Sequence, residues 1–193
     1  QAISIAIIPH AAMRQTRVGE LSMWKGAAAA NSARNGLFGA LLAESGFTGP
    51  SEPFVGKMGV IAQMLGGADF RDAAFARMEQ GSAPHRICDA YIKKYPVEYH
   101  AQSAVDAAVE LQREIENWEE IDRIEIETFR AAYEIIVDDP EKWQPRTRET
   151  ADHSLQYIVG AALMDEQDTQ ETFSGERLRD ARIRFRPPVP VEL

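Results

Sequence analysis

The sequence predicts an α+β fold in which a helical first part is followed by a small unit of mixed helices and strands. Two observations support this prediction: residues 25–44 are rich in helix formers, and the second half alternates between segments of helical and of strand periodicity. The Gly-Ser-Ala-Pro stretch at residues 81–84 separates parts that differ in residue types. We therefore predict a domain boundary there, with one domain over residues 1–83 and the other over 84–193.

The helix predicted over residues 25–44 should lie inside a bundle. Small residues such as Gly36, Gly39 and Ala40 forfeit buried area but let another helix approach closely. Gly46 follows as the expected stop signal. The apolar stripe that should face the interior consists of Ala29, Ala33, Leu37 and Leu41.

The second half should contain two helices and two strands. Ser103 and Asp106 are placed to cap the first helix, and alternating residues predict half-buried strands that pack against the helices. The amphipathic pattern of the later helix runs through Leu155, Ile158, Val159, Ala162 and Leu163. The predicted elements are a helix at 103–115, a strand at 123–129, the later helix, and a strand at 182–185.

Charge and cysteine content exclude several classes of protein. The net charge of -9 repels phosphate backbones, so we predict no nucleic-acid partner. Cys88 is the only cysteine, which permits neither an intrachain disulfide nor a cysteine-ligated iron–sulfur cluster and suits a reducing cytoplasm. No apolar run reaches the roughly 20 residues of a membrane helix. Because Gln1 opens an apolar run without an initiator Met, we expect the chain to be part of a longer protein.

Lys25 stands at the start of the first predicted helix, where the helix dipole favours anions rather than cations. One interpretation is that Lys25 binds a carboxylate together with the free N–H groups of Ala27 and Ala28. The simpler interpretation is a lysine that points into solvent.

The segment 91–103 concentrates two Lys, three Tyr, a Glu, a His and a Gln around Pro96. Glu98, His100 and Gln102 share a parity, so an extended backbone would place them on one face. These groups suit proton transfer. The alternative is a polar linker in which His100 caps the following helix or is half-buried.

Asp152 and His153 begin the later helix, and Tyr157 lies one turn further along. Asp152 and His153 could therefore belong to a functional site, or one of them could cap the helix. His10 and His85, beside prolines, are predicted to be structural, and Cys88 a small buried hydrophobe.

Three motifs resemble those of the MmgE/PrpD family, and in particular of its 2-methylcitrate dehydratases. They are residues 19–26 with 29–31, residues 95–105, which are similar to the family's Phe/Tyr-Pro-x-Glu-Phe/Tyr-His-x-Gln signature, and residues 153–157. The resemblance implies a large all-helical domain with a smaller α/β domain, a site between them, and a homodimer. It also implies complete chains more than twice this length.

By the same resemblance, Lys25 and Tyr157 match pocket residues of the family's cis-aconitate decarboxylase branch, and Lys93 or Lys94 matches a second pocket lysine. Glu98 stands where that branch has a histidine, which favours a dehydratase.

The expected activity is a lyase that dehydrates 2-methylcitrate or citrate to a 2-methylaconitate-type product in propionate metabolism. Acid–base chemistry alone should suffice, with no metal and no cofactor. His100 would move protons with Tyr157 or Glu98. The remaining predicted site residues would bind the tricarboxylate substrate, and these are Lys25, Lys93, Lys94, Gln102 and His153.

Other activities remain open within and outside the superfamily. Cis-aconitate decarboxylation and iminodisuccinate epimerisation also begin with proton chemistry beside a carboxylate. A non-catalytic helical interaction domain would instead leave Lys25, His100 and Tyr157 apart from any shared cleft.

Overall fold

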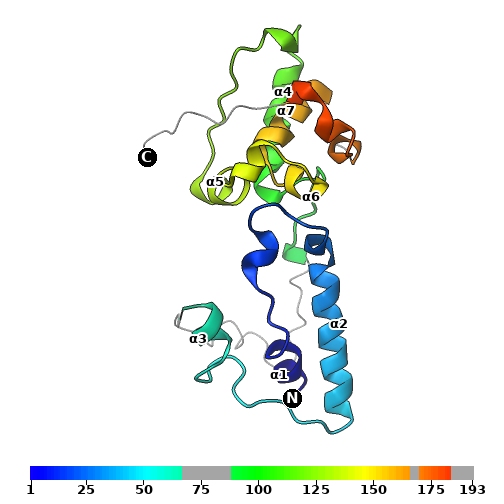
Figure 1. Cartoon of the computed structure of the whole chain (residues 1–193), viewed down its shortest axis with the longest axis vertical. Helices are drawn as coiled ribbons and strands as arrows, with labels where there is room; N and C mark the ends of the chain where they lie inside the picture. Colours follow the sequence, from blue (N-terminus) through cyan, green and yellow to red (C-terminus); the bar gives the residue numbers. More distant parts are fainter. Residues whose placement is uncertain (67–87, 166–169, 184–193) are drawn as a thin grey trace. The chain divides into compact units, whose positions relative to one another are not determined.

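The computed structural model describes residues 1–66, 88–165 and 170–183 (Figure 1). The chain forms two compact units, one of residues Gln1–Arg14 with Gly26–Tyr91 and one of Gln15–Lys25 with Ile92–Leu193. The boundary predicted near residue 83 lies outside the described residues and stays a prediction. Within the described ranges, all regular secondary structure is helical. None of the helices described there combines the length and the apolar character that crossing a bilayer requires.

The first unit contains α1 (Ala2–Ile7), α3 (Val60–Met64) and most of α2 (Trp24–Glu44). The long α2 confirms the helix predicted over residues 25–44. It ends as predicted at Gly46, which adopts a left-handed φ of 88°. The Gly46 N–H donates to the Ala43 carbonyl and the Phe47 N–H to the Leu42 carbonyl, each at 3.0 Å. These bonds satisfy carbonyls that the end of the helix would otherwise leave free.

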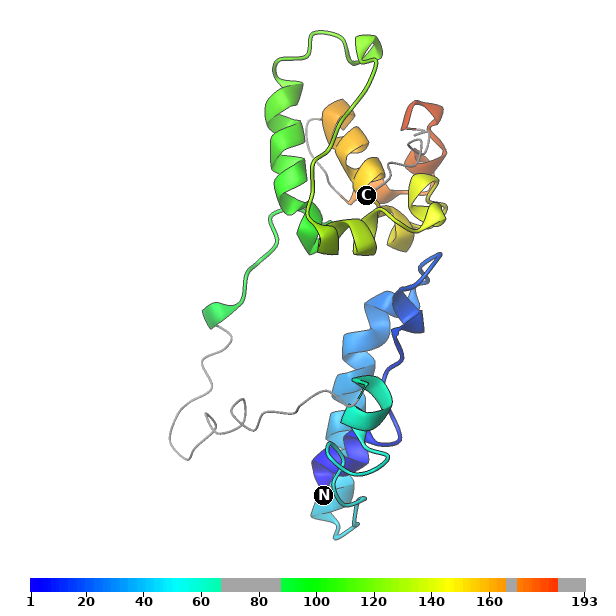
Figure 2. The same ribbon diagram turned by 90° about the vertical axis from the view of Figure 1, so that its left-hand side faces the viewer.

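Helix α1 packs against α2 at Gly39 (Figure 2). A Cβ at Gly39 would lie 2.8 Å from the carbonyl oxygen of Ala2 and 3.3 Å from the Cβ of Ala6. The predicted close approach is therefore confirmed at Gly39, but Gly36 and Ala40 are exposed and the predicted buried stripe is wrong. Within α2 the buried residues are Asn35 and Gly39, because α1 covers a different face from the predicted one. The stripe residues Ala29, Ala33, Leu37 and Leu41 are exposed.

The second unit is organised around α4 (Gln102–Gln112) and α7 (Leu155–Asp165), which lie side by side (Figure 1). Two shorter helices, α5 (Arg130–Ile136) and α6 (Arg148–Ala151), complete its α-helical part. Short 3₁₀ helices connect these elements. They are η1 (Arg14–Arg17), η5 (Tyr99–Ala101), η6 (Trp118–Glu120), η7 (Pro140–Trp143), η8 (Glu171–Phe173), η9 (Arg177–Arg179) and η10 (Ala181–Ile183).

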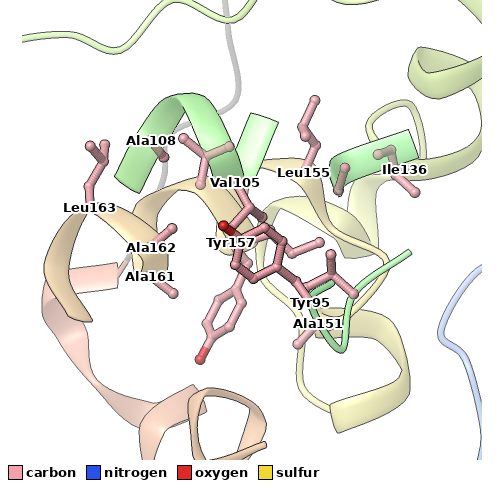
Figure 3. Close-up of a cluster of buried hydrophobic side chains, with 14 of the residues drawn as sticks. Tyr95, Val105, Ala108, Ile136, Ala151, Leu155, Tyr157, Ala161, Ala162 and Leu163 are labelled. Carbon is pink, nitrogen blue, oxygen red and sulfur yellow. The ribbon is translucent and has the colours of Figure 1, made fainter. Parts of the chain in front are cut away.

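Helix α7 is the centre of the core (Figure 3). Every residue from Leu155 to Leu163 is buried, so the helix itself is confirmed and its predicted amphipathic character is wrong. Helix α4 packs on one side, and η7 and η10 also pack against it. Burial of each large apolar side chain contributes about 1.5–3 kcal/mol, so this helix holds the unit together.

The predicted strand at residues 123–129 is wrong, because these residues form neither a helix nor a strand. Ile124 and Ile126 instead line a groove beside α4 and α7 and remain 40% and 37% exposed. Of the second predicted strand, Arg182 and Ile183 belong to η10 and residues 184–185 lie outside the described residues. The α/β part of the predicted fold is therefore not confirmed in the part of the chain that the structure describes.

Two smaller predictions are also corrected. Asp106 does not cap α4 but accepts hydrogen bonds from Lys94 Nζ at 2.5 Å and the Tyr95 hydroxyl at 2.7 Å. Cys88 is exposed rather than buried. His85 lies outside the described residues.

Substituting Gly39→Val should destabilise the packing of α1, because its Cβ would overlap the Ala2 carbonyl. Overpacking of this kind costs about 1–3 kcal/mol in the free energy of unfolding. Gly36→Val is the matched control, since a Cβ there meets nothing within 4 Å. Denaturant unfolding, with amide hydrogen exchange at the residues of α1, measures the difference. Equal stability of the two variants would contradict the proposed packing.

Candidate functional site

Two threonines hold the segment before α2 against α6 in the second unit. The Leu21 N–H donates to Thr150 Oγ1 and the Leu21 carbonyl accepts from Thr147 Oγ1, both at 2.9 Å. Thr147 also caps α6 by accepting from the Thr150 N–H. Leu21 is buried at 2% exposure, so these bonds are shielded from water. They fix the chain four residues before Lys25.

Lys25 is held in the site by Asp152. Its Nζ lies 2.6 Å from Asp152 Oδ1, 3.0 Å from His153 Nδ1 and 3.4 Å from the Glu149 carbonyl oxygen. The Lys25 side chain is 14% exposed, which excludes the interpretation that it points into solvent. The Asp152 carboxylate supplies the negative charge that the start of α2 favours.

Asp152 and His153 form a carboxylate–imidazole pair at 2.6 Å. Lys25 Nζ, which can only donate, lies 3.0 Å from the same His153 nitrogen, so the three side chains form one polar cluster. Burial alone would raise the pKa of the Asp152 carboxyl, but hydrogen bonds from His153 and Lys25 and the charge of Lys25 bring it below its ordinary value. The carboxylate is therefore ionised at neutral pH.

Neither Asp152 nor His153 is needed to cap α7. Ser154 does this instead, because its Oγ accepts from the Tyr157 N–H at 3.1 Å and donates to the Lys142 carbonyl. The structure thus leaves the side chains of Asp152 and His153 available to the site.

Glu98 and His100 form a second carboxylate–imidazole pair. Glu98 Oε2 accepts from the His100 backbone N–H at 2.6 Å, and its Oε1 lies 2.9 Å from His100 Nδ1. The backbone here is the 3₁₀ helix η5 rather than the extended chain expected, yet the predicted pairing forms because Glu98 caps that turn. The Glu98 N–H donates to the Asp152 carbonyl at 2.9 Å, which links the two pairs.

His100 lines a groove of about 300 Å³ between α4, α7 and residues 124–129. Its ring packs against Phe129 with centroids 5.3 Å apart. Ser103 and Thr128 also line the groove and offer hydroxyl groups. Lys25 and Tyr157 are not among its lining residues.

Lys93, Lys94 and Gln102 shape the loop before α4. Gln102 Oε1 accepts from the backbone N–H groups of Lys94 and Tyr95, each at 3.0 Å. Lys93 Nζ donates to the Val97 carbonyl at 2.8 Å. Hydrogen bonds with Asp106 and Tyr95 raise the pKa of Lys94 to about 12. The substrate-binding roles predicted for these three residues stay predictions.

Tyr157 belongs to the core rather than to the groove. It is 2% exposed, its hydroxyl donates to the Thr172 carbonyl at 2.6 Å, and its ring lies near Phe173. The catalytic role predicted for Tyr157 stays a prediction.

Comparison with known families accounts for most of the chain. Residues 1–73 match the MmgE/PrpD N-terminal domain, and residues 95–185 match the MmgE/PrpD C-terminal domain. The chain belongs to the MmgE/PrpD family. Both the lysine at the start of α2 and the two carboxylate–imidazole pairs lie within the matched residues. Members of the MmgE/PrpD family are generally dehydratase-like lyases, and membership suggests a function of that broad class.

Two residues of the site were missed from the sequence. Asp152 was noted as a helix start but not as the partner of Lys25, which is 127 positions away. Lys142 follows no apolar or charged pattern, yet it is 1% exposed, and its burial lowers the pKa of its amine. For Asp152, the one signal in the sequence is the histidine beside it. For Lys142, the sequence carries no such signal.

Asp152 should contribute stability that disappears in acid. Its pKa is lowered in the folded state from an unfolded value of about 3.9, so the stabilisation is present above that pH and is lost as pH falls through the folded-state pKa. Asp152→Asn should lower the free energy of unfolding by about 1–3 kcal/mol at pH 7, with a smaller difference from wild type below pH 4.

Urea unfolding of both proteins between pH 3 and 8 measures that difference. The control is Asp138→Asn at an exposed position, which should change stability by less than about 0.5 kcal/mol. A difference for Asp152→Asn that does not shrink in acid would contradict the assigned ion pair.

Proposed function

We propose that the protein is a hydro-lyase that removes water from 2-methylcitrate or citrate by acid–base chemistry, within propionate metabolism. The observation that carries this proposal is the Glu98–His100 pair at the edge of a groove of about 300 Å³. Small-molecule sites have volumes of roughly 300–1,000 Å³, so the groove is of suitable size. Membership of a dehydratase-like family supports the same reaction class.

In this proposal His100 is the general base. Its Nδ1 faces Glu98, which leaves Nε2 free to take a proton from the carbon beside a substrate carboxylate. The Glu98 carboxylate stabilises the imidazolium that forms. The C–H electron pair becomes the new double bond, and the hydroxyl leaves as water after receiving a proton from an acid of the site.

The geometry favours Glu98 over Tyr157 as the partner of His100. Glu98 contacts the imidazole directly, whereas the Tyr157 hydroxyl is already bonded to the Thr172 carbonyl inside the core. A phenol held this way would orient α7 and thereby the residues before it. We therefore assign Tyr157 an indirect role in the proposed mechanism.

Lys25 and His153, which do not line the groove, are the proposed ligands of a substrate carboxylate that extends beyond it. Both are partly buried, and the Lys25 ammonium in such a place attracts an anion more strongly than one in bulk water. Lys93 and Lys94 are further candidates, with Gln102 holding the loop that carries them. The substrate carries three negative charges, so several cations are needed to bind it.

Replacement of His100 tests the proposed base. His100→Gln should lower kcat for 2-methylcitrate or citrate by about 100-fold or more, because general-base catalysis contributes 10²–10⁴. Glu98→Gln should cause a smaller loss, since the imidazole remains but its orienting carboxylate is gone. The formation of the double bond is followed by its ultraviolet absorbance.

The matched control is His10→Gln, at an exposed histidine of the first unit. Its activity should stay within about threefold of wild type. Activity of His100→Ala within the same range would rule out the proposed role of His100.

Product analysis separates this reaction from the alternatives. Rising absorbance with a hydroxy acid and no released gas supports the dehydratase. Carbon dioxide from cis-aconitate would indicate the decarboxylase, and proton exchange on iminodisuccinate without a new double bond would indicate the epimerase. A non-catalytic domain would leave all three substrates unchanged.

A further inference from the structure

Lys142 is a buried lysine whose amine has no hydrogen-bond partner among the described residues. The residue is 1% exposed, so its ammonium group does not reach solvent at the end of an apolar stem. A buried charge without a hydrogen bond is costly and is normally paired. Such a group at the edge of a cluster of charged residues therefore needs an explanation.

The backbone rather than the amine fixes Lys142 in place. Its N–H donates to the Asp139 carbonyl at 2.9 Å at the start of η7, and its carbonyl accepts from Ser154 Oγ. Helix η7 packs against α7. Among the described residues, the side chain is thus held inside the protein without an ion pair that would stabilise it.

Four charged groups act on the Lys142 amine. Burial lowers its pKa, the charges of Asp139, Asp152 and Glu141 raise it, and the charge of Lys25 lowers it further. No hydrogen bond to any of these carboxylates is formed in the described structure. Asp152 is the one of the three carboxylates that also binds Lys25.

The charge of Asp152 therefore acts on two lysines, of which Lys25 contacts it and Lys142 does not. If Lys25 is to bind a substrate carboxylate, Asp152 must either compete with the substrate or find another cation. His153 would then be the remaining partner of the Asp152 carboxylate among the described residues, and losing the ion pair with Lys25 would be unfavourable for this partly buried group. Lys142 supplies the second cation that this exchange requires.

We propose that Lys142 is a positioning residue for carboxylate binding: when a ligand carboxylate pairs with Lys25, the Asp152 side chain turns to Lys142. This inference rests on the proposed function and adds to it the way in which Lys25 becomes available. In the free protein, Lys25 pairs with Asp152 and Lys142 has no ion-pair partner among the described residues. In the complex, Lys25 pairs with the ligand carboxylate and Lys142 pairs with Asp152.

Binding of propane-1,2,3-tricarboxylate tests the exchange separately from catalysis. This ligand carries three carboxylates and no hydroxyl, so it cannot be dehydrated. Titration calorimetry should give an affinity about 10-fold weaker for Lys142→Met than for wild type. Lys57→Met, at an exposed lysine of the first unit, is the matched control and should bind as wild type does.

A double-mutant cycle with Asp152→Asn distinguishes exchange from a general loss of structure. In the Asp152→Asn protein there is no carboxylate to transfer, so adding Lys142→Met should change the affinity by less than about twofold. A purely structural role for Lys142 would weaken binding equally in both backgrounds, which would overturn the proposal.

Proton uptake in the wild-type protein provides a measurement that needs no variant. The Lys142 amine has a lowered pKa in the free protein, and pairing with Asp152 raises it again. Ligand binding should therefore take up protons at alkaline pH, measured as a dependence of the binding enthalpy on the ionisation enthalpy of the buffer. The absence of uptake as the pH rises to 10.5, the ordinary pKa of a lysine, would contradict the exchange.

The outcomes also separate this inference from the proposed function. Equal affinity of wild type and Lys142→Met would overturn the role of Lys142 and leave the dehydratase proposal standing. No binding to the wild-type protein at millimolar ligand would overturn both.

Discussion

Asp152 is the residue through which three distant segments of the chain meet. Its carboxylate binds Lys25 at the start of α2 and His153 beside it, and its carbonyl accepts from the Glu98 N–H. Asp152 directly follows α6, so its position depends on the Thr147 and Thr150 bonds that hold this helix against the backbone of Leu21. The candidate site therefore depends on a few hydrogen bonds of high sequence separation more than on any single helix.

Burial decides which of the ion pairs matter for this geometry. The Lys94–Asp106 pair is as short as the Lys25–Asp152 pair, but both of its side chains are more than half exposed. Exposed pairs contribute about 0–1 kcal/mol, because water screens them and two long side chains lose freedom. The Asp152 side chain is 22% exposed, so losing either of its partners leaves a charge that water compensates only in part. The Lys94–Asp106 pair shapes a loop, whereas the Lys25–Asp152 pair determines the charge of the site.

The sequence predicted those features whose hydrogen bonds are local. Helix α2 and its end at Gly46 follow from residues within a few positions of one another, and the Glu98–His100 pair spans only two. A strand needs a partner elsewhere in the chain, which the alternation at residues 123–129 could not supply. Burial of α7 on all sides depends on segments that pack around it from both directions in sequence. Lys25 and Asp152 were each noticed, but nothing in their patterns joins residues 127 positions apart.

The resident carboxylate has a consequence for selectivity in the proposed reaction. At physiological salt the Debye length is about 8 Å, so the net charge of -9 has little effect at the site and nearby groups dominate. A ligand carboxylate must compete with Asp152 for Lys25, and one carboxylate gains little by replacing another. A tricarboxylate offers two further anionic groups that can bind other donors while the exchange occurs. The Lys25–Asp152 contact in the free protein thus disfavours monocarboxylates relative to tricarboxylates. Specificity is the difference between the affinities for these two kinds of ligand.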